Sequence, residues 1–477
     1  MKDFSRNYNF MLFFTLFLSI YCYLEEGNIY LPMTSNFTLE HSQSKVNNKN
    51  YYTIALEIGT PGEEYEVQVD TSTATSWIPT SQCKNCKLAH RLYDEEDSRT
   101  SSPTDIHIVI EDEDGNVEGY QMSDNFKLGT YKLKQYGFVG VTRLADDFKD
   151  HHQGKLGLGY KSHYLKDEEF NFLEKLKKNN LISKKIFSLN AINEKKGMLF
   201  VGDLPGKEYN SYCNVTTDTD DLDDMYKESW ICHLTHVGVF EKEKGIFNKI
   251  KYYDELEHND LVNFDSAYDY IAVPISEKEH IQKLLDKAKL KCKERKNNQP
   301  KNEEGSLRNR IREKEITITC QTDMDDLKEK DLALSFVLQG YSYSLPLELL
   351  FKETSYKNEI EMLIKYIDDE AAIWTFGYPF MNQFLMIFDM EDNHVGIKKL
   401  KKTALPIISI NNKDWLKYNL QEESSSSSPI FRIIAYATLI LVGLAIVFFI
   451  YHAIRKKNIN SSKAGMNNIE NNSNVLY

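Results

Sequence analysis

The chain has 477 residues, 41% of them hydrophobic and 27% charged, a balance typical of a globular protein rather than a disordered one. This length is sufficient for more than one domain-sized core. The formal net charge of -13 argues against a nucleic-acid binder, which would present a basic face, and it is compatible with basic partners or with simple solubility.

The N-terminal end predicts a secretory signal peptide, which we place at residues 1–25. Residues 10–21 form a short apolar run behind Lys2 and Arg6. A signal anchor is the alternative, but the run is shorter than the ~20 residues that a membrane span needs. Residues 26–49 are then a short pro-segment or linker ahead of the first strand.

The next segments are rich in β-forming residues and partly alternate between apolar and polar side chains, which predicts strands at residues 52–58 and 65–69. The sequence Gly59-Thr60-Pro61-Gly62 between them is typical of a turn. The second strand delivers Asp70 to a strand end. Further on, residues 106–110 and 117–128 flank Asp114-Gly115-Asn116, which indicates a β-hairpin.

One motif occurs twice, far apart in the chain, around Asp70 and Asp265. In each copy the aspartate ends an apolar stretch, a small hydroxyl residue follows (Thr71 or Ser266), and an apolar-proline pair closes the segment at the same offset. We interpret the two copies as a long, degenerate duplication. It predicts two similar lobes that each supply one carboxylate to a shared site. For either aspartate alone, the alternative is a turn residue at a strand end.

A helix is predicted after the second motif, because Ser276-Glu277-Lys278-Glu279 fits a capping box and apolar residues follow at helical spacing. Residues 287–315 are polar and mostly basic. We interpret them as a surface insertion tied by Cys292 and Cys320, and a solvated charged loop without function is the alternative. The apolar positions of the helix are Ile281, Leu284, Leu285 and Ala288.

Six cysteines remain after Cys22 leaves with the signal peptide, and all precede the C-terminal apolar run, which indicates an oxidising compartment. Six cysteines allow fifteen pairings, of which we predict the pairing of neighbours. The Cys-X-X-Cys spacing could be half of a zinc site, but no second half has suitable spacing. The predicted disulfides are Cys83–Cys86, Cys213–Cys232 and Cys292–Cys320.

The C-terminal end predicts a membrane anchor. A linker at residues 403–429 ends in a serine-rich tether, and residues 433–451 are apolar and of spanning length. Basic residues follow, so the positive-inside rule places the helix at 430–454, the tail 455–477 in the cytosol, and the bulk of the chain in the lumen or outside. A buried core helix is the alternative.

Four sequons match the pattern for N-glycosylation. The predicted topology exposes Asn36 and Asn214 to the glycosylation machinery. It leaves Asn460 and Asn471 bare in the cytosol.

Many ordered segments of this chain resemble the pepsin-like aspartic proteases. The resemblance covers residues 50–402 and implies an all-β, bilobal fold with an N-lobe at about 50–205 and a C-lobe at about 206–402. It also implies a cleft between the lobes and a hairpin flap that closes over it. The segments that carry it are 52–61, 70–79, Cys83 with Cys86, 93–100, 154–159, 186–189, 197–202, 265–274, 374–377 and 380–397.

The same resemblance implies that Asp70 and Asp265 are a catalytic pair. Two carboxyl groups held close together cannot both ionise cheaply, so they share a proton. The charged member takes a proton from a water molecule between them, and the neutral member donates a hydrogen bond to the substrate carbonyl. Water attacks directly, so neither a metal nor a cofactor is expected.

The motifs depart from the family pattern at the third position in both copies and also at the fourth position in the second copy. The family has Asp-Thr-Gly or Asp-Ser-Gly, whereas the third positions here are Ser72 and Ala267. A side chain there can obstruct the close backbone approach that glycine permits. The next position is usually a small hydroxyl residue that supports the aspartate, a chemistry that Thr73 keeps and the bulky Tyr268 does not.

The flap departs further, since aligning Gly115 and Gly119 with the family's glycines puts Asp112 where the family has a tyrosine. A carboxylate closing over the pair would favour basic substrates. A solvated acidic turn that never closes is the alternative. The residues expected to contact substrate are Ser72, Trp77, Asp112 and Ala267.

The leading hypothesis is a monomeric, membrane-anchored aspartic endopeptidase of type I topology, in the secretory pathway or at the cell surface, that cleaves peptide or protein substrates. The first alternative is a catalytically inactive homologue that binds peptides or proteins as a membrane glycoprotein. A structural surface glycoprotein that uses only the fold is the second.

Overall fold

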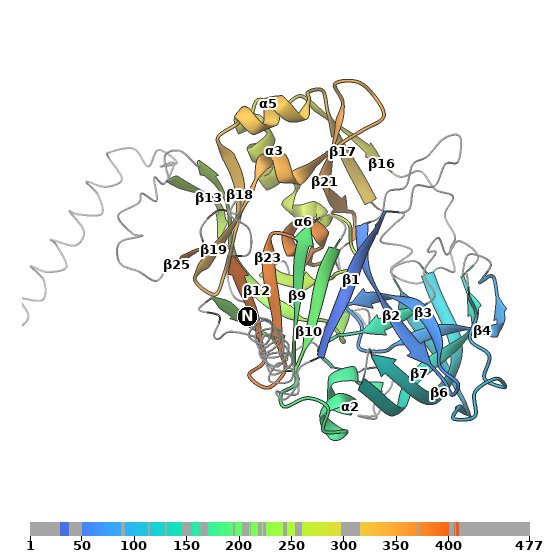
Figure 1. The fold of residues 1–477 in the computed structure, drawn as a ribbon. Helices are drawn as coiled ribbons and strands as arrows, with labels where there is room; N and C mark the ends of the chain where they lie inside the picture. The colour runs from blue at the N-terminus through green and yellow to red at the C-terminus, as the bar shows by residue number, and fades with distance from the viewer. Residues whose placement is uncertain are drawn as a thin grey trace, which may run out of the picture. The chain divides into compact units, whose positions relative to one another are not determined.

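The computed structural model describes residues 29–37 and, with gaps, 50–409. The chain divides into two compact units, residues 1–420 and 421–477, and all the described residues lie in the first (Figure 1). The predicted signal peptide, serine-rich tether, membrane helix and tail lie outside the described residues. The gaps are 87–90, 113–114, 129–130, 146–153, 162, 164–169, 194–195, 203–208, 210, 218–221, 223–225, 242–245, 253–259, 297–314, 370–371, 400–404 and 406.

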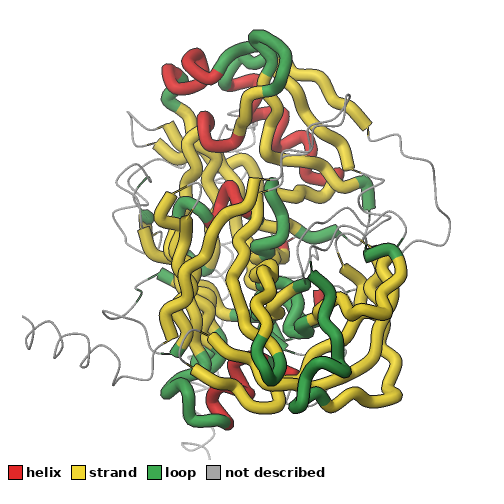
Figure 2. Tube along the Cα trace, turned by 45° about the vertical axis from the view of Figure 1, so that its right-hand side comes forward, coloured by secondary structure: helices red, strands yellow, loops and turns green. Residues whose placement is uncertain are grey.

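Strands dominate the fold, as predicted, and they form two large sheets (Figure 2). The first sheet has 13 strands in the order β11-β24-β23-β9-β10-β1-β2-β3-β8-β4-β7-β6-β5. Its strands are β1 (Ile29–Phe37), β2 (Asn50–Ile58), β3 (Glu63–Asp70), β4 (Trp77–Lys84), β5 (Ser102–Asp112), β6 (Gly115–Leu128), β7 (Tyr131–Leu144), β8 (Lys155–Gly157), β9 (Ile186–Asn193), β10 (Lys196–Val201), β11 (Tyr212–Asn214), β23 (Phe384–Asp389) and β24 (His394–Lys399).

The second sheet has 12 strands with the main order β16-β17-β21-β15-β22-β14-β12-β18-β19-β25, while β13 pairs with β12 and β20 with β21. Its strands are β12 (Ile231–Glu241), β13 (Ile246–Tyr252), β14 (Leu261–Phe264), β15 (Ile271–Pro274), β16 (Cys292–Lys296), β17 (Glu315–Cys320), β18 (Leu332–Leu338), β19 (Tyr341–Pro346), β20 (Phe351–Glu353), β21 (Ile360–Ile367), β22 (Trp374–Phe376) and β25 (Ile408–Ser409).

Short helices accompany the sheets, and α3, with ten residues, is the longest of those described. None of the helices within the described ranges has the length and apolar character that a membrane span requires. The helical elements include α2 (Phe172–Lys178), η4 (Ile275–Glu277), α3 (Lys278–Lys287), α5 (Met324–Glu329), η5 (Leu347–Leu350) and α6 (Tyr378–Met381).

The two strands predicted before Asp70 are confirmed as β2 and β3, which pair in an antiparallel manner. The predicted hairpin is confirmed as β5 and β6, which are longer than the sequence pattern indicated. Asp112, the last residue of β5, pairs with Gly115, the first residue of β6. Gly115 has φ 134°, a conformation that favours glycine.

The helix predicted after the second motif is confirmed as α3, and its four apolar residues are buried. The prediction of a capping box at its start is wrong. Ser276 lies inside the 3-10 helix η4, and Glu277 occupies the cap position of α3 without a side-chain cap hydrogen bond. The helix α3 therefore begins directly after the 3-10 helix η4, without a capping box.

All three predicted disulfides are present. Cys213 lies on β11 of the first sheet and Cys232 on β12 of the second, so this disulfide joins the two sheets covalently. Cys292 and Cys320 are register partners on β16 and β17. The two ends of the predicted basic insertion therefore extend the second sheet as a hairpin, and residues 297–314 lie outside the description.

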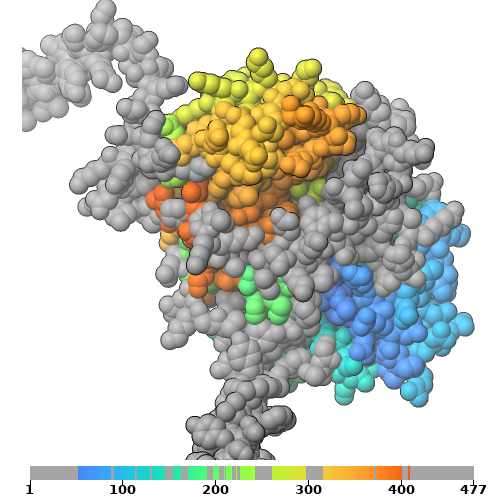
Figure 3. All heavy atoms as spheres, turned by 45° about the horizontal axis from the view of Figure 1, so that its top comes forward, coloured from blue at the N-terminus to red at the C-terminus, as the bar shows by residue number. Residues whose placement is uncertain are grey.

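Aromatic side chains from both sheets pack together in the main core. Phe187 on β9 stacks on Phe388 of β23 with 4.6 Å between ring centroids, and Trp230, just ahead of β12, lies 5.2 Å from Phe388. The Trp230 indole also donates to the Leu158 carbonyl at 2.8 Å, directly after β8. Residues of the second sheet (yellow to orange) and of the first strands (blue) occupy separate parts of the visible surface (Figure 3).

Candidate active site

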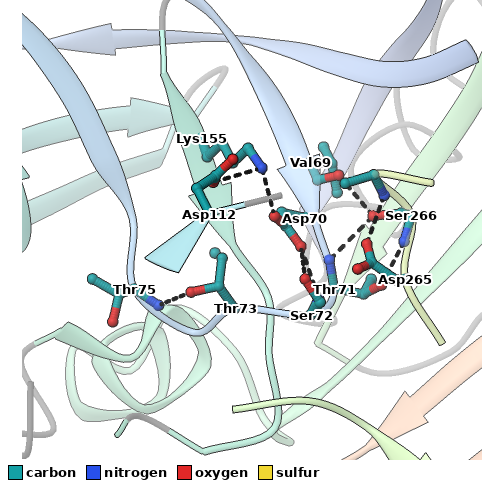
Figure 4. Close-up of polar contacts among 12 residues, drawn as sticks. Val69, Asp70, Thr71, Ser72, Thr73, Thr75, Asp112, Lys155, Asp265 and Ser266 are labelled. Carbon is teal, nitrogen blue, oxygen red and sulfur yellow. Dashed lines mark hydrogen bonds and ion pairs between the residues drawn. The ribbon is translucent and has the colours of Figure 1, made fainter. Parts of the chain in front are cut away.

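The two aspartate-bearing loops are tied together by four reciprocal hydrogen bonds (Figure 4). The Thr71 N–H donates to Ser266 Oγ at 3.1 Å, and the Ser266 N–H donates to Thr71 Oγ1 at 3.0 Å. Each hydroxyl then donates to the carbonyl before the opposite aspartate, Thr71 to Phe264 at 2.8 Å and Ser266 to Val69 at 2.7 Å. The small hydroxyl residue of each copy therefore binds one loop to the other, with near two-fold symmetry.

Asp70 ends β3 and Asp265 follows β14, and both side chains are completely buried. Asp70 Oδ1 accepts from the Ser72 N–H at 2.8 Å and from the Ser72 hydroxyl at 2.7 Å. Asp265 Oδ1 accepts from the Ala267 N–H at 2.9 Å. The residues that replace the family's glycines thus still give a backbone hydrogen bond, and Ser72 adds a hydroxyl donor that neither glycine nor alanine has.

A buried lysine lies beside the first aspartate. Lys155, the first residue of β8, places its Nζ 3.0 Å from Asp70 Oδ2 and 2.8 Å from Asp112 Oδ2. The side chains of Lys155 and Asp70 are completely buried, and Asp112 is 1% exposed. Strand β8 lies between β3 and β4, and its parallel pairing with β3 sets Lys155 opposite Gln68. The cation therefore joins the first aspartate to the tip of the β5–β6 hairpin.

This ion pair changes the interpretation of the hairpin. Asp112 is neither a solvated turn residue nor a free carboxylate above the pair, because Lys155 engages it. The negative charge of Asp112 is balanced within the protein, which removes the main physical reason for expecting a preference for basic substrates. In this conformation Lys155 links Asp112, the last residue of β5, to the first aspartate.

A buried glutamate holds the backbone after Ser72. Glu228, 1% exposed, accepts hydrogen bonds from the Thr73 hydroxyl at 2.7 Å, the Ala74 N–H at 2.8 Å and the Thr75 hydroxyl at 3.1 Å. The expectation that Thr73 supports Asp70 is therefore wrong, because its hydroxyl proton goes to Glu228. The third donor to the Asp70 carboxylate, besides the N–H and the hydroxyl of Ser72, is Lys155 at Oδ2.

The second loop has different neighbours. The Asp265 N–H donates to the Phe376 carbonyl at 3.2 Å, and the Tyr378 N–H donates to the Tyr268 carbonyl at 2.7 Å. Gly377 lies between them, and a Cβ there would meet the Tyr268 carbonyl oxygen at 2.3 Å. The bulky Tyr268 is accommodated because its ring packs against Tyr270, with 5.1 Å between ring centroids.

The four residues expected to contact substrate are all buried in this conformation. Ser72, Ala267 and Asp112 lie next to the aspartates as expected, through the contacts given above. Trp77 lies instead in a hydrophobic cluster with Ile110 and Val139. This position makes it part of the core beneath the hairpin.

Two residues of the site escaped the sequence analysis, Lys155 and Glu228. Lys155 carried a usable signal, because it is the one charged residue in the run Gly154-Lys155-Leu156-Gly157-Leu158-Gly159, one of the segments that carry the family resemblance. Glu228 carried no such signal, since it stands among other polar residues and lies far in sequence from the loop that it binds.

Comparison with known proteins agrees with this architecture. The profile of the eukaryotic aspartyl protease family matches residues 51–400. Renin from Echis ocellatus is 22% identical over 79% of this chain and 85% of its own length, and cathepsin D from Rattus norvegicus is 23% identical over 74% and 82%. Procardosin-A from Cynara cardunculus is 31% identical, but over only 22% of this chain and 22% of its own length. The chain belongs to the eukaryotic aspartyl protease family.

Proposed function

We propose that the protein is an aspartic endopeptidase in which Asp70 and Asp265 together activate a water molecule for attack on a peptide bond. The observation that carries this proposal is the reciprocal hydrogen bonding of Thr71 and Ser266, which brings the two aspartate-bearing loops side by side. A pair of buried carboxyl groups on such a frame suits general acid-base catalysis.

A catalytically inactive homologue that binds peptides or proteins is the second candidate function. The observation behind it is the ion pair of Lys155 with Asp70 Oδ2, since a side chain of the protein already engages this carboxylate oxygen. Such a protein would use the same surface for binding without hydrolysis.

The deciding experiment is cleavage of a peptide library at acidic pH by the full-length protein and by Asp70→Asn and Asp265→Asn. We expect each substitution to lower kcat/KM by at least about 10²-fold. Asp260→Asn is the matched control, because Asp260 is also a buried aspartate but pairs with His233 at 3.0 Å on the second sheet. Absence of cleavage by folded wild-type protein, with retained peptide binding, would favour the inactive homologue.

We further propose that the protein follows the secretory pathway and is anchored by residues 430–454 in type I topology. The three disulfides support an oxidising compartment. Asn214, exposed at the end of β11, is available for glycosylation. Loss of a glycosidase-sensitive mobility shift in Asn214→Gln, with Asn471→Gln unchanged, tests the topology. A shift that depends on Asn471 would reverse it.

A further inference from the structure

We propose that Lys155 is a positioning residue that keeps Asp70 ionised, so that Asp70 is the base of the catalytic pair and Asp265 carries its proton. This inference rests on the proposed function, because it assigns roles within the same pair. It uses a contact that belongs to this chain, the buried Asp70–Lys155–Asp112 cluster.

The three charged side chains of this cluster are buried together. One cation lies between two carboxylates, at 3.0 and 2.8 Å, and none of the three side chains is more than 1% exposed. A buried ammonium strongly favours the ionised form of a carboxylate within hydrogen-bond distance. Protonating Asp70 would remove its charge-assisted hydrogen bond with the ammonium, which would then pair with Asp112 alone.

The two copies of the site differ at one register position. Strand β8 runs parallel to β3 and sets Lys155 opposite Gln68, and β22 runs parallel to β14 in the same way and sets Thr375 opposite Asn263. Thr375 is therefore the counterpart of Lys155 on the Asp265 side. Since threonine carries no charge, this register position holds a cation in the first copy and an uncharged residue in the second.

The remaining charged groups do not alter the assignment. The elements packed against Asp70 bring Lys155 on β8, Asp112 on β5, Asp265 on the second loop and Glu228. Three of these are acids, and Lys155 alone among them favours a negative Asp70. Because Lys155 contacts Asp70, the proton shared by the pair resides on Asp265.

Each aspartate then has a defined role in the proton transfers of the reaction. Asp70 takes one proton from water, whose oxygen bonds to the carbonyl carbon, while the Asp265 proton passes to the carbonyl oxygen. The tetrahedral diol collapses as the C–N bond breaks, the leaving nitrogen receives the proton held by Asp70, and a diol proton returns to Asp265. One water is consumed for each peptide bond, and nothing is oxidised or reduced.

The first test is the pH dependence of kcat/KM for the full-length protein and for Lys155→Met. Without the cation, Asp70 protonates more readily, so we expect the acidic limb of the profile to move to higher pH by about one unit or more. Lys155→Arg keeps the charge and is expected to keep the acidic limb. An acidic limb that is identical in wild type and Lys155→Met would overturn the proposal.

Two control variants separate this role from general structural effects. Lys365→Met removes another lysine that pairs with a buried carboxylate, Glu315, at 3.0 Å in the second sheet, and is expected to leave the acidic limb unchanged. Asp112→Asn releases the hairpin but keeps the Lys155–Asp70 pair. We expect it to change KM and to leave the acidic limb in place, and a matching shift of the limb would contradict the assignment.

The second test does not require activity. In a double-mutant cycle of Lys155→Met and Asp70→Asn, the losses in Tm should be strongly non-additive at about pH 7, and this non-additivity should decrease as the pH is lowered. The sign follows from linkage, because the paired carboxylate stabilises the fold only while ionised, and this contribution is lost as the pH falls.

The outcomes distinguish the two proposals. Coupling at neutral pH without any peptide cleavage would mean that Lys155 holds Asp70 ionised in a protein that is not a peptidase. Cleavage with an unmoved acidic limb and no coupling would retain the peptidase and reject the role of Lys155.

Discussion

The two aspartate loops share one frame and differ in what surrounds it. In both, a hydroxyl residue crosses to the other loop and a backbone N–H donates to the aspartate. The first loop adds the Ser72 hydroxyl, the Lys155 ammonium and the Glu228 carboxylate. The features common to both loops therefore set the geometry of the site, and the differences between the loops make its electrostatics asymmetric.

Substitutions should destabilise the shared frame most at the glycines that pack against each loop. A Cβ at Gly157 would lie 2.6 Å from the backbone carbon of Ala74, and one at Gly377 would lie 2.3 Å from the Tyr268 carbonyl oxygen. We expect Gly157→Ala and Gly377→Ala each to lower the free energy of unfolding by about 3 kcal/mol. Thermal unfolding of the full-length variants measures this loss. If only one of the two alanine variants were destabilised, the two loops would not be structurally equivalent.

Removing Glu228 should damage the first loop alone. Glu228→Gln puts an amide N–H₂ group against donors that now point at a carboxylate, and we expect a loss of about 1–3 kcal/mol. Denaturant unfolding gives the value. The Asp70→Asn variant is the reference for an isosteric replacement of a carboxylate by an amide in the same loop. A Glu228→Gln protein as stable as wild type would show that the hydrogen bonds to the Glu228 carboxylate do not stabilise the fold.

The crossing hydroxyls should contribute equally. Thr71→Ala and Ser266→Ala each remove one donor and one acceptor between the loops, and we expect a loss of about 1–2 kcal/mol from each. The double variant should lose less than the sum, because the two side chains serve the same junction. Chemical denaturation of the two single variants and the double variant tests this symmetry. Unequal losses of stability in the two single variants would mean that one hydroxyl contributes more than the other to holding the loops together.

The smallest effect concerns the residues that replaced the family's glycines. Ser72→Gly removes a hydrogen bond to the Asp70 carboxylate, so kcat/KM should fall by about tenfold. Ala267→Gly removes a methyl group and keeps the N–H donor, so kcat/KM should stay within about twofold. Steady-state kinetics at matched folded fraction measures both. Equal effects would argue against the asymmetry proposed for the pair.

Local patterns predicted the parts of the structure that depend on short-range sequence. The strands before Asp70, the β5–β6 hairpin and the helix α3 all follow from alternation, turn residues or helical spacing. The disulfides were predicted as neighbours in sequence, and they are. The resemblance covered residues 50–402, and the family profile then matched residues 51–400, a range that contains both aspartates.

Contacts between distant residues could not be predicted in this way. Thr73 donates to Glu228, 155 positions away, and Lys155 lies 85 positions from Asp70. Neither partner is marked by periodicity, because a buried ion pair depends on which strands become neighbours. The capping box failed for a related reason, since the packing of η4 ahead of α3 decides where the helix begins.

The order of strands in the first sheet has a consequence for synthesis on the ribosome. Strand β23, from near the end of the folded region, pairs with β9, and β24 pairs with β11. The sheet that carries Asp70 is therefore completed only after residue 399 has emerged, although β1 to β8 are made much earlier. Such long-range pairing slows folding. A nascent chain cut short before Phe384 would leave β9 as an open edge, a known starting point for aggregation.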